Sequence, residues 1–221
     1  MVIHMADYFS NFLKYLPRLL AGLKLTVLIA VFGIMLAIVL GIILCIFSIS
    51  GKKILQKIAS FYITIIRGIP LMILALFMYF GVIKNSLSLV LSAIIILAIN
   101  ASAYMAEIFR AGIQAIDYGQ MEAARSLGLS YFQTMRKIIL PQAVKIMIPS
   151  LMNQFISSLK DTAILSAISV NELTMTAKTI IARNYKAFEL YSYAAIIYIV
   201  VITALTWLSK KVERRLSYDK R

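Results

Sequence analysis

The sequence has 221 residues, of which 62% are hydrophobic, and its formal net charge is +14. Soluble domains are about 45–50% apolar, so a chain of this size cannot bury so much apolar surface in its own core, and a bilayer is the expected solvent. The single cysteine, Cys45, excludes a disulfide or a multi-cysteine metal site within the chain, and the only histidine, His4, receives no role.

Five apolar segments predict membrane-spanning helices, because a helix needs roughly 20 apolar residues to cross the hydrocarbon. We place them at residues 25–50, 58–83, 85–107, 146–171 and 190–209. The first, third and fifth satisfy this length without internal charge. The expected fold is therefore an all-α integral membrane protein with five core transmembrane helices, forming a single transmembrane domain over residues 1–221.

The second and fourth segments are expected to be irregular. Gly68 and Pro70 should break or bend the second span near Arg67, since proline cannot continue the hydrogen bonds of a helix. The fourth segment has Pro149 near its start and the adjacent charges of residues 160–161 within it. We expect this fourth span to be short or distorted.

The charges of the loops predict the orientation of the chain, since loops rich in Lys and Arg stay in the cytoplasm. Most of the 23 basic residues lie in three stretches on one side: Lys52, Lys53 and Lys57, then Arg110, Arg125, Arg136, Lys137 and Lys145, and finally Lys210, Lys211, Arg214, Arg215, Lys220 and Arg221. This pattern predicts an outside N-terminus and a basic cytoplasmic tail over residues 210–221. Residues 1–24, which mix aromatic, apolar and basic residues, are expected to be an extracytoplasmic or interfacial segment.

The segment at residues 110–142, expected in the cytoplasm, is polar, and its pattern predicts two helices joined by a bend. Asp117 with Gln120 has the spacing of a capping box, and so has Ser130 with Gln133. Gly128 lies between them, where a glycine ends a helix.

The first of these helices is expected to present a small apolar face made by Met121, Ala124 and Leu127. Such a face suits docking into a groove on another protein. The alternative is an amphipathic helix that packs on the spans of its own chain. A DNA-binding helix-turn-helix is rejected, because the segment is tethered between two spans and has few basic residues.

The same segment resembles the cytoplasmic EAA loop of the permease subunits of bacterial ABC importers. The residues that match its spacing are Glu122, Ala123, Ala124, Gly128, Ile138, Leu140 and Pro141. The stretches "RGIPL", "NASAYMAEIFRAGIQAI" and "LKDTAILSAISVNEL" are similar to the polar amino acid branch of these permeases, over about residues 12 to 215.

The resemblance implies an ABC type I importer permease in the bacterial inner membrane, in which the loop is a coupling helix that sits in a cleft of the ATPase. It also implies the partners: two ATPase subunits that bind ATP and Mg, a second permease subunit that is identical or related, and an extracytoplasmic amino acid-binding protein.

The chain lacks the sequence G-x-x-x-x-G-K-[ST], the loop that cradles nucleotide phosphates. We therefore expect ATP hydrolysis in a separate subunit, no catalytic residue, metal or cofactor in this chain, and no nucleic-acid partner.

Charged and polar residues within the spans are the candidate substrate contacts, because such residues usually face an interior or a cavity. An amino acid needs a donor for its carboxylate and an anion for its ammonium group. The candidates for the pathway are Arg67, Asn100, Tyr104, Glu107, Asn153, Ser157 and Asp161. The two acids favour a basic amino acid over an acidic one.

Structural alternatives exist for the charged candidates. For Arg67, a structural ion pair and a contact with the substrate are equally good interpretations. Glu107 lies three residues before Arg110, which allows a local ion pair, and Asp161 adjoins Lys160.

The competing function is an ion-coupled secondary amino acid transporter that needs no ATPase. Such proteins often contain inverted repeats with paired broken spans. Five spans and one unduplicated polar loop argue against that function, and no selectivity-filter sequence favours a channel.

Overall fold

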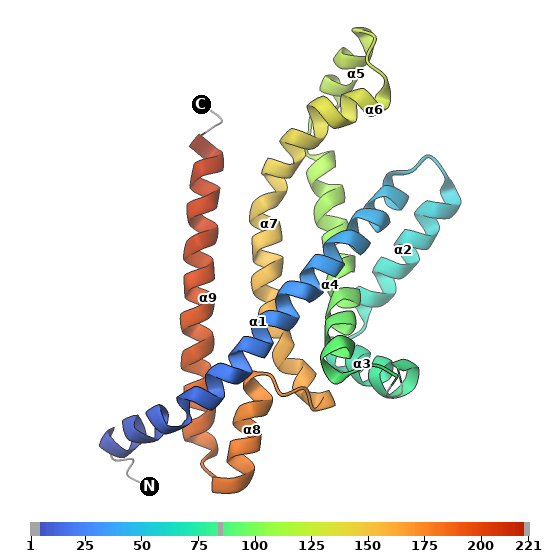
Figure 1. Cartoon of the computed structure of the whole chain (residues 1–221). Coiled ribbons are helices and arrows are strands. Elements are labelled where there is room, and N and C mark those ends of the chain that lie inside the picture. Colours follow the sequence, from blue (N-terminus) through green and yellow to red (C-terminus); the bar gives the residue numbers. More distant parts are fainter. Residues whose placement is uncertain (1–4, 84–85, 219–221) are drawn as a thin grey trace.

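The computed structural model describes residues 5–83 and 86–218, and every regular element in these ranges is helical (Figure 1). The sequence interpretations that concern His4, Lys220 and Arg221 lie outside the described residues. The helices run up and down between two ends of the molecule. The N-terminus lies at one end, and the C-terminus lies at the other.

Helix α1 (Met5–Ile49) is one continuous helix of 45 residues. The described part of the segment that we expect at the interface, residues 5–24, therefore continues without a break into the first span. Tertiary packing explains the continuity, since Leu19 is buried in a cluster with Leu173, Leu190 and Tyr193. These contacts hold the N-terminal part of α1 in line with the span.

The second apolar segment is broken, as Gly68 and Pro70 predicted. Helix α2 (Lys53–Gly68) ends there, and α3 (Leu71–Leu76) continues into the π-helix η1 (Phe77–Ile83). The two parts meet at an angle of 105°. Pro70 has no backbone N–H to donate to the preceding turn, so the chain is extended at residues 69–70 and turns sharply.

Helix α4 (Leu89–Gln114) is the central helix, packed along α1 through small residues. A Cβ atom added at Gly41 would lie 2.6 Å from Cβ of Met105, so the two helices touch almost backbone to backbone. Small residues at a crossing allow this close approach, which is the common way for helices to associate in a membrane.

The polar segment forms α5 (Tyr118–Ser126), α6 (Tyr131–Thr134) and the π-helix η2 (Met135–Ile139). The chain then returns through α7 (Leu140–Asp161) and the 3₁₀ helix η3 (Thr162–Ile168). It ends with α8 (Leu173–Asn184) and the long α9 (Ala187–Tyr218). In Figure 1, α5, α6, the loop between α1 and α2 and the C-terminus share one end, while α3 and α8 lie at the other.

Helices α1, α4 and α9 are long and apolar enough to span a membrane, and α2 with α3 and η1 meets the same criteria as a bent pair, which counts as a fourth span if the pair crosses as one unit. Helix α7 has 22 residues, or about 33 Å at 1.5 Å per residue, and packs against α4 and α9. Its charges and its polar residues make it less apolar than the others. It completes five core helices, and its distorted end at η3 agrees with the expected irregular fourth span.

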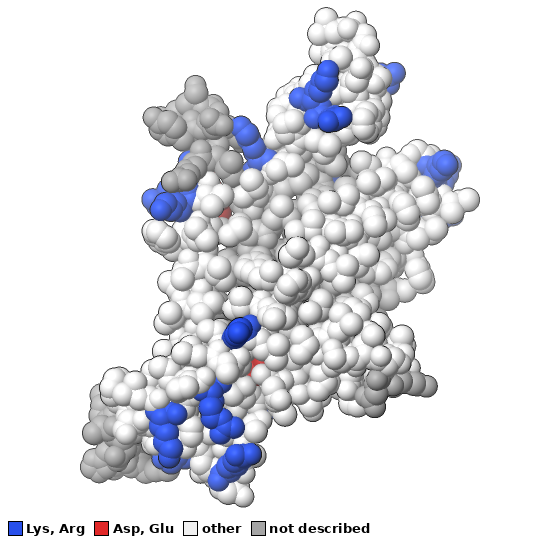
Figure 2. Space-filling model, viewed as in Figure 1, with Lys and Arg blue, Asp and Glu red and all other residues white. Residues whose placement is uncertain are grey.

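On the face shown in Figure 2, most Lys and Arg side chains lie toward the two ends of the molecule. The surface between the ends is largely uncharged. This distribution fits a membrane-spanning middle with headgroup-level and aqueous ends.

Candidate functional site

The caps of the polar segment are formed partly as predicted. The Ser130 and Gln133 capping box is confirmed: each side chain accepts a hydrogen bond from the backbone N–H of the other residue, at 3.3 and 2.8 Å. Asp117 caps α5 by accepting from the Gly119 N–H. The capping box expected for Asp117 and Gln120 is not formed. The side-chain amide of Gln120 instead exchanges two hydrogen bonds with the side-chain amide of Gln142 in α7. That pair ties α5 to the base of the next span.

The bend between α5 and α6 depends on Gly128, as predicted. Its φ of 87° lies in the left-handed region, which glycine adopts without strain. The N–H of Gly128 donates to the carbonyl of Arg125, and the N–H of Leu129 donates to that of Ala124. This is the Schellman arrangement of a helix C-terminus, and it aims α6 back toward the spans.

The exposed face of α5 differs from the expected one. Ala124 is 3% exposed and Met121 is half-buried, because α5 packs against α6 and η2. Leu127 is 84% exposed, and Tyr118 and Phe132 are also exposed. The outward apolar surface is therefore made by these three side chains, at the tip of the molecule.

The other residues that match the EAA spacing are distributed over both sides of this tip. Glu122, Ala123, Leu140 and Pro141 are exposed, while Ile138 is half-buried. The two alternatives of the sequence interpretation are thus both partly realised: one side of the segment packs on its own chain, and the other side is open.

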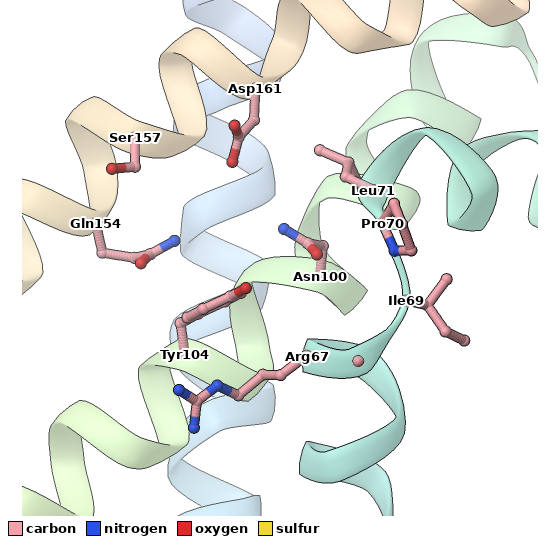
Figure 3. A pocket seen from close by; sticks show the side chains of 10 residues that line it. Arg67, Ile69, Pro70, Leu71, Asn100, Tyr104, Gln154, Ser157 and Asp161 are labelled. Atoms are coloured by element: carbon pink, nitrogen blue, oxygen red, sulfur yellow. The ribbon is translucent and has the colours of Figure 1, made fainter.

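Near the broken span lies a pocket of about 490 Å³ between α2, α3, α4 and α7 (Figure 3). Asp161, Gln154 and Asn100 point into a common space, and Arg67 extends beside Tyr104. The residues that line the pocket are Arg67, Gly68, Ile69, Pro70, Leu71, Asn100, Tyr104, Gln154, Ser157 and Asp161. The volume is within the range of small-molecule sites.

A second hollow of about 540 Å³ adjoins the first and shares Arg67, Tyr104 and Gln154 with it. It continues along α4 to Ala115 and is lined by Glu107. From Asn100 to Ala115 is about 22 Å along a helix. The two hollows therefore follow α4 from the broken span toward the end that bears α5.

The charged residues of this region fall into two groups. Glu107 accepts two hydrogen bonds from Arg110, at 3.0 and 2.8 Å, in a bidentate ion pair. Arg67 lies 3.8 Å from the same carboxylate and 5.4 Å from the ring centre of Tyr104. The geometry thus supports a structural ion pair for Arg67 and a local ion pair with Arg110 for Glu107.

Asp161 is different, because it makes no ion pair with Lys160 or with any other residue that the structure describes. Its carboxylate is half-buried and faces the pocket. A carboxylate in that position is available to a bound cation.

One pathway candidate lies elsewhere, and one polar residue that lines both hollows was not among the candidates. Asn153 is exposed and lines neither hollow, whereas Gln154 lines both. Gln154, Ser157 and Asp161 have the i, i+3, i+7 spacing of one helix face. That spacing is the signal in the sequence that points to Gln154.

Comparison with known proteins gives a family for this architecture. Residues 33–218 match the family described as binding-protein-dependent transport system inner membrane component. The chain belongs to this family. It is 36% identical to the arginine transport system permease protein ArtQ of Bacillus subtilis strain 168, over 94% of this chain and 96% of the relative. It is also 36% identical to the glutamine transport system permease protein GlnP of Escherichia coli strain K12, over 91% and 94% of the two chains.

Solved structures agree with this assignment. A crystal structure of an amino acid ABC transporter with histidines is 38% identical, with a TM-score of 0.90 over 97% of this chain and 100% of the other. The MetNI methionine ABC transporter has a TM-score of 0.72 over 91% and 95% of the two chains; at 20% identity it shows the shared fold alone.

These matches establish the chain as a multi-pass inner-membrane permease subunit of an ABC importer with the type I fold. Members of this family work with an ATPase and with a binding protein. The ion-coupled secondary transporter is not favoured.

Proposed function

We propose that this chain forms the translocation pathway of an ATP-driven importer of polar amino acids, with basic amino acids as the preferred class. One observation carries the proposal: the pocket at the broken span presents a cation, Arg67, and an acid, Asp161, that forms no ion pair with the residues that the structure describes. Amino acids are zwitterions, so opposite charges in one pocket match both of their backbone groups. Two relatives are named as permeases for arginine and for glutamine, which supports polar amino acids as the substrate class.

Five of the lining residues have a role in this proposal. The guanidinium of Arg67 binds the substrate carboxylate, and the carboxylate of Asp161 binds the ammonium group or a cationic side chain. Asn100, Gln154 and Ser157 supply hydrogen bonds to the remaining polar atoms. Buried polar groups of the substrate require such partners, because their loss of hydration is otherwise uncompensated.

The energy for transport comes from partner subunits in this proposal. Two ATPase subunits bind ATP and Mg and receive the segment from Glu122 to Pro141, whose tip carries the exposed Leu127. A second permease, identical or related, completes the pathway, and an amino acid-binding protein delivers the substrate outside. The N-terminus then lies outside, and the C-terminus lies in the cytoplasm, on the side of α5.

Reconstitution of the complex tests this function. The chain, its ATPase and its binding protein are placed in proteoliposomes, and uptake of labelled arginine, histidine, glutamine and glutamate is measured with and without ATP. We expect ATP-dependent accumulation, strongest for a basic or amide amino acid and weakest for glutamate. Uptake that follows an ion gradient and ignores ATP would contradict the proposal.

A further inference from the structure

One face of α9 is exposed along the whole length of the span. Ile196, Ile199 and Val200 lie on this face with large exposed areas, and Thr203 and Ala204 continue it. Their spacing of three and four residues places them in a single column on the helix. This column is a lipid-accessible apolar surface in the part of the chain that the structure describes.

The column ends at a cluster of aromatic and basic side chains. Trp207 is 63% exposed, and together with Lys210, Lys211 and Arg214 it lines a hollow of about 360 Å³. These four residues have the spacing i, i+3, i+4, i+7, so they share the face of the apolar column. Nζ of Lys211 lies 5.0 Å from the ring centre of Trp207, which holds the ammonium group over the ring.

The nearest acid in the sequence does not neutralise this cluster. The Oε1 atom of Glu213 instead accepts a hydrogen bond from the hydroxyl of the buried Ser209, at 3.0 Å. Among the described residues, no carboxylate lies within 4.0 Å of the amino or guanidinium nitrogens of Lys210, Lys211 or Arg214. Three cations therefore face one hollow, and no described residue supplies a counter-ion within that distance.

We propose that this hollow binds the headgroup of an anionic phospholipid, whose acyl chains lie along the apolar column of α9. The phosphate lies among the three cations, and Trp207 lies at the level of the interface, where tryptophan is enriched. From Ile196 to Trp207 is about 16 Å along the helix. That distance is close to half of the roughly 30 Å hydrocarbon, which is the length of one leaflet.

The match of length and charge selects a lipid over a free anion, because a free phosphate would gain nothing from the apolar column. The site lies apart from the substrate pocket and does not depend on the proposed substrate. In the orientation proposed above, the lipid belongs to the inner leaflet.

The test uses the fluorescence of Trp207, which is the only tryptophan of the chain. The purified full chain in a neutral detergent is titrated separately with short-chain phosphatidylglycerol, with short-chain phosphatidylcholine and with inorganic phosphate. We expect a saturable change of Trp207 emission with phosphatidylglycerol, and at least tenfold weaker responses with the other two. The joint substitution Lys210→Gln, Lys211→Gln and Arg214→Gln should weaken phosphatidylglycerol binding by about a hundredfold, since each basic residue near a membrane contributes about 1 kcal/mol.

A matched variant controls for the loss of three charges. Lys52→Gln, Lys53→Gln and Lys57→Gln remove the same charge from exposed positions at the same end of the molecule, and they should leave phosphatidylglycerol binding unchanged. Native mass spectrometry of the two triple variants provides a second count of retained lipid, independent of fluorescence. Equal responses to phosphatidylglycerol and phosphatidylcholine, an equal response to inorganic phosphate, or full binding by the first variant would each overturn the proposal.

Discussion

Glu107 and Asp161 are both acids within apolar segments, yet their surroundings differ. Both oxygens of Glu107 accept hydrogen bonds from Arg110, one turn along the same helix. Asp161 faces the pocket without an ion pair among the described residues. A paired carboxylate stabilises its own helix, whereas one without an internal partner remains available to a ligand. We therefore assign the ammonium contact to Asp161 in preference to Glu107.

Replacing Asp161 with Asn should weaken uptake through binding. A hydrogen bond to a charged group contributes about 1.5–3 kcal/mol, so the KM for amino acid uptake should rise by about tenfold or more. Asp161→Glu retains the charge and should recover part of the loss. The measurement is ATP-driven uptake by the reconstituted complex over a range of substrate concentrations.

Asn153→Ala is the matched control, because Asn153 lies on the same helix but outside both hollows. Its KM should stay within about twofold of the unmodified protein. An unchanged KM in Asp161→Asn, or an equal rise in both variants, would remove Asp161 from the substrate site.

At the residue level, the rarity of a residue type within a span selected the candidates, and their contact with substrate stays a prediction. A charge within a span is rare, so Arg67 and Asp161 could be selected by composition alone, and the structure places both at one pocket. The polar run at residues 153–158 offered no such distinction. Which of its side chains turns inward depends on how α7 packs against α4 and α9, and that is a tertiary property.

At the scale of elements, the crossing of α1 and α4 depends on small residues. Gly41→Val should lower the free energy of unfolding by about 1–3 kcal/mol, because the new side chain meets Met105 and the backbone of Ala106. Thermal unfolding of the purified chain in detergent measures this loss. Gly51→Val has no neighbour within 4 Å and should unfold near the temperature of the unmodified chain. Equal effects of the two substitutions would show that the crossing does not limit stability.

The bend at Gly128 makes a second prediction at this scale. A side chain at its φ of 87° costs roughly 1–2 kcal/mol, so Gly128→Val should shift the tip formed by α5 and α6 while the spans remain folded. Substrate-stimulated ATP hydrolysis by the complex should then fall severalfold, with membrane insertion unchanged. Glu122→Lys, which alters the exposed side of α5, should have the same effect.

Ser126→Ala serves as the comparison for these variants, since Ser126 is exposed in the last turn of α5 and its hydroxyl donates to the backbone carbonyl of Glu122 in its own helix. Its stimulated ATPase activity should match that of the unmodified complex. Normal activity in both Gly128→Val and Glu122→Lys would argue against a coupling role for this segment.

Local signals predicted where the elements end better than how they are oriented. Gly68 and Pro70 marked the break of the second span, but its angle of 105° depends on the packing of α3 against η3 and α4. The turn chemistry of Gly128 and Ser130 is local and was predicted correctly. The continuity of α1 was missed, because the burial of Leu19 by distant helices overrides the mixed composition of its first turns.

At the scale of the whole molecule, the basic segments that the charge pattern assigns to one side of the membrane lie at one end of the structure. The segment α5–α6, the α1–α2 loop and the C-terminus share one end (Figure 1). The proposed orientation places this end in the cytoplasm, because its loops carry most of the basic residues.

Cysteine labelling in intact cells tests this orientation. Cys45 is buried and is first replaced by serine, which leaves a background without reactive thiols. A membrane-impermeant maleimide should then label Tyr185→Cys, whose position is 87% exposed at the outer end. It should label Lys52→Cys only after the membrane is opened. Labelling of the two positions in the reverse order would invert the assigned topology.

Helix α1 is longer than the membrane requires. Its apolar part, residues 25–49, measures about 37 Å, against a hydrocarbon thickness of about 30 Å. Figure 1 shows α1 inclined to α7 and α9, as expected for a span that tilts to bury its excess length. A thicker bilayer would make α1 more upright and shift it against α4, to which its glycines are closely fitted. Transport should therefore depend on acyl-chain length, which makes membrane thickness a physical variable of the importer.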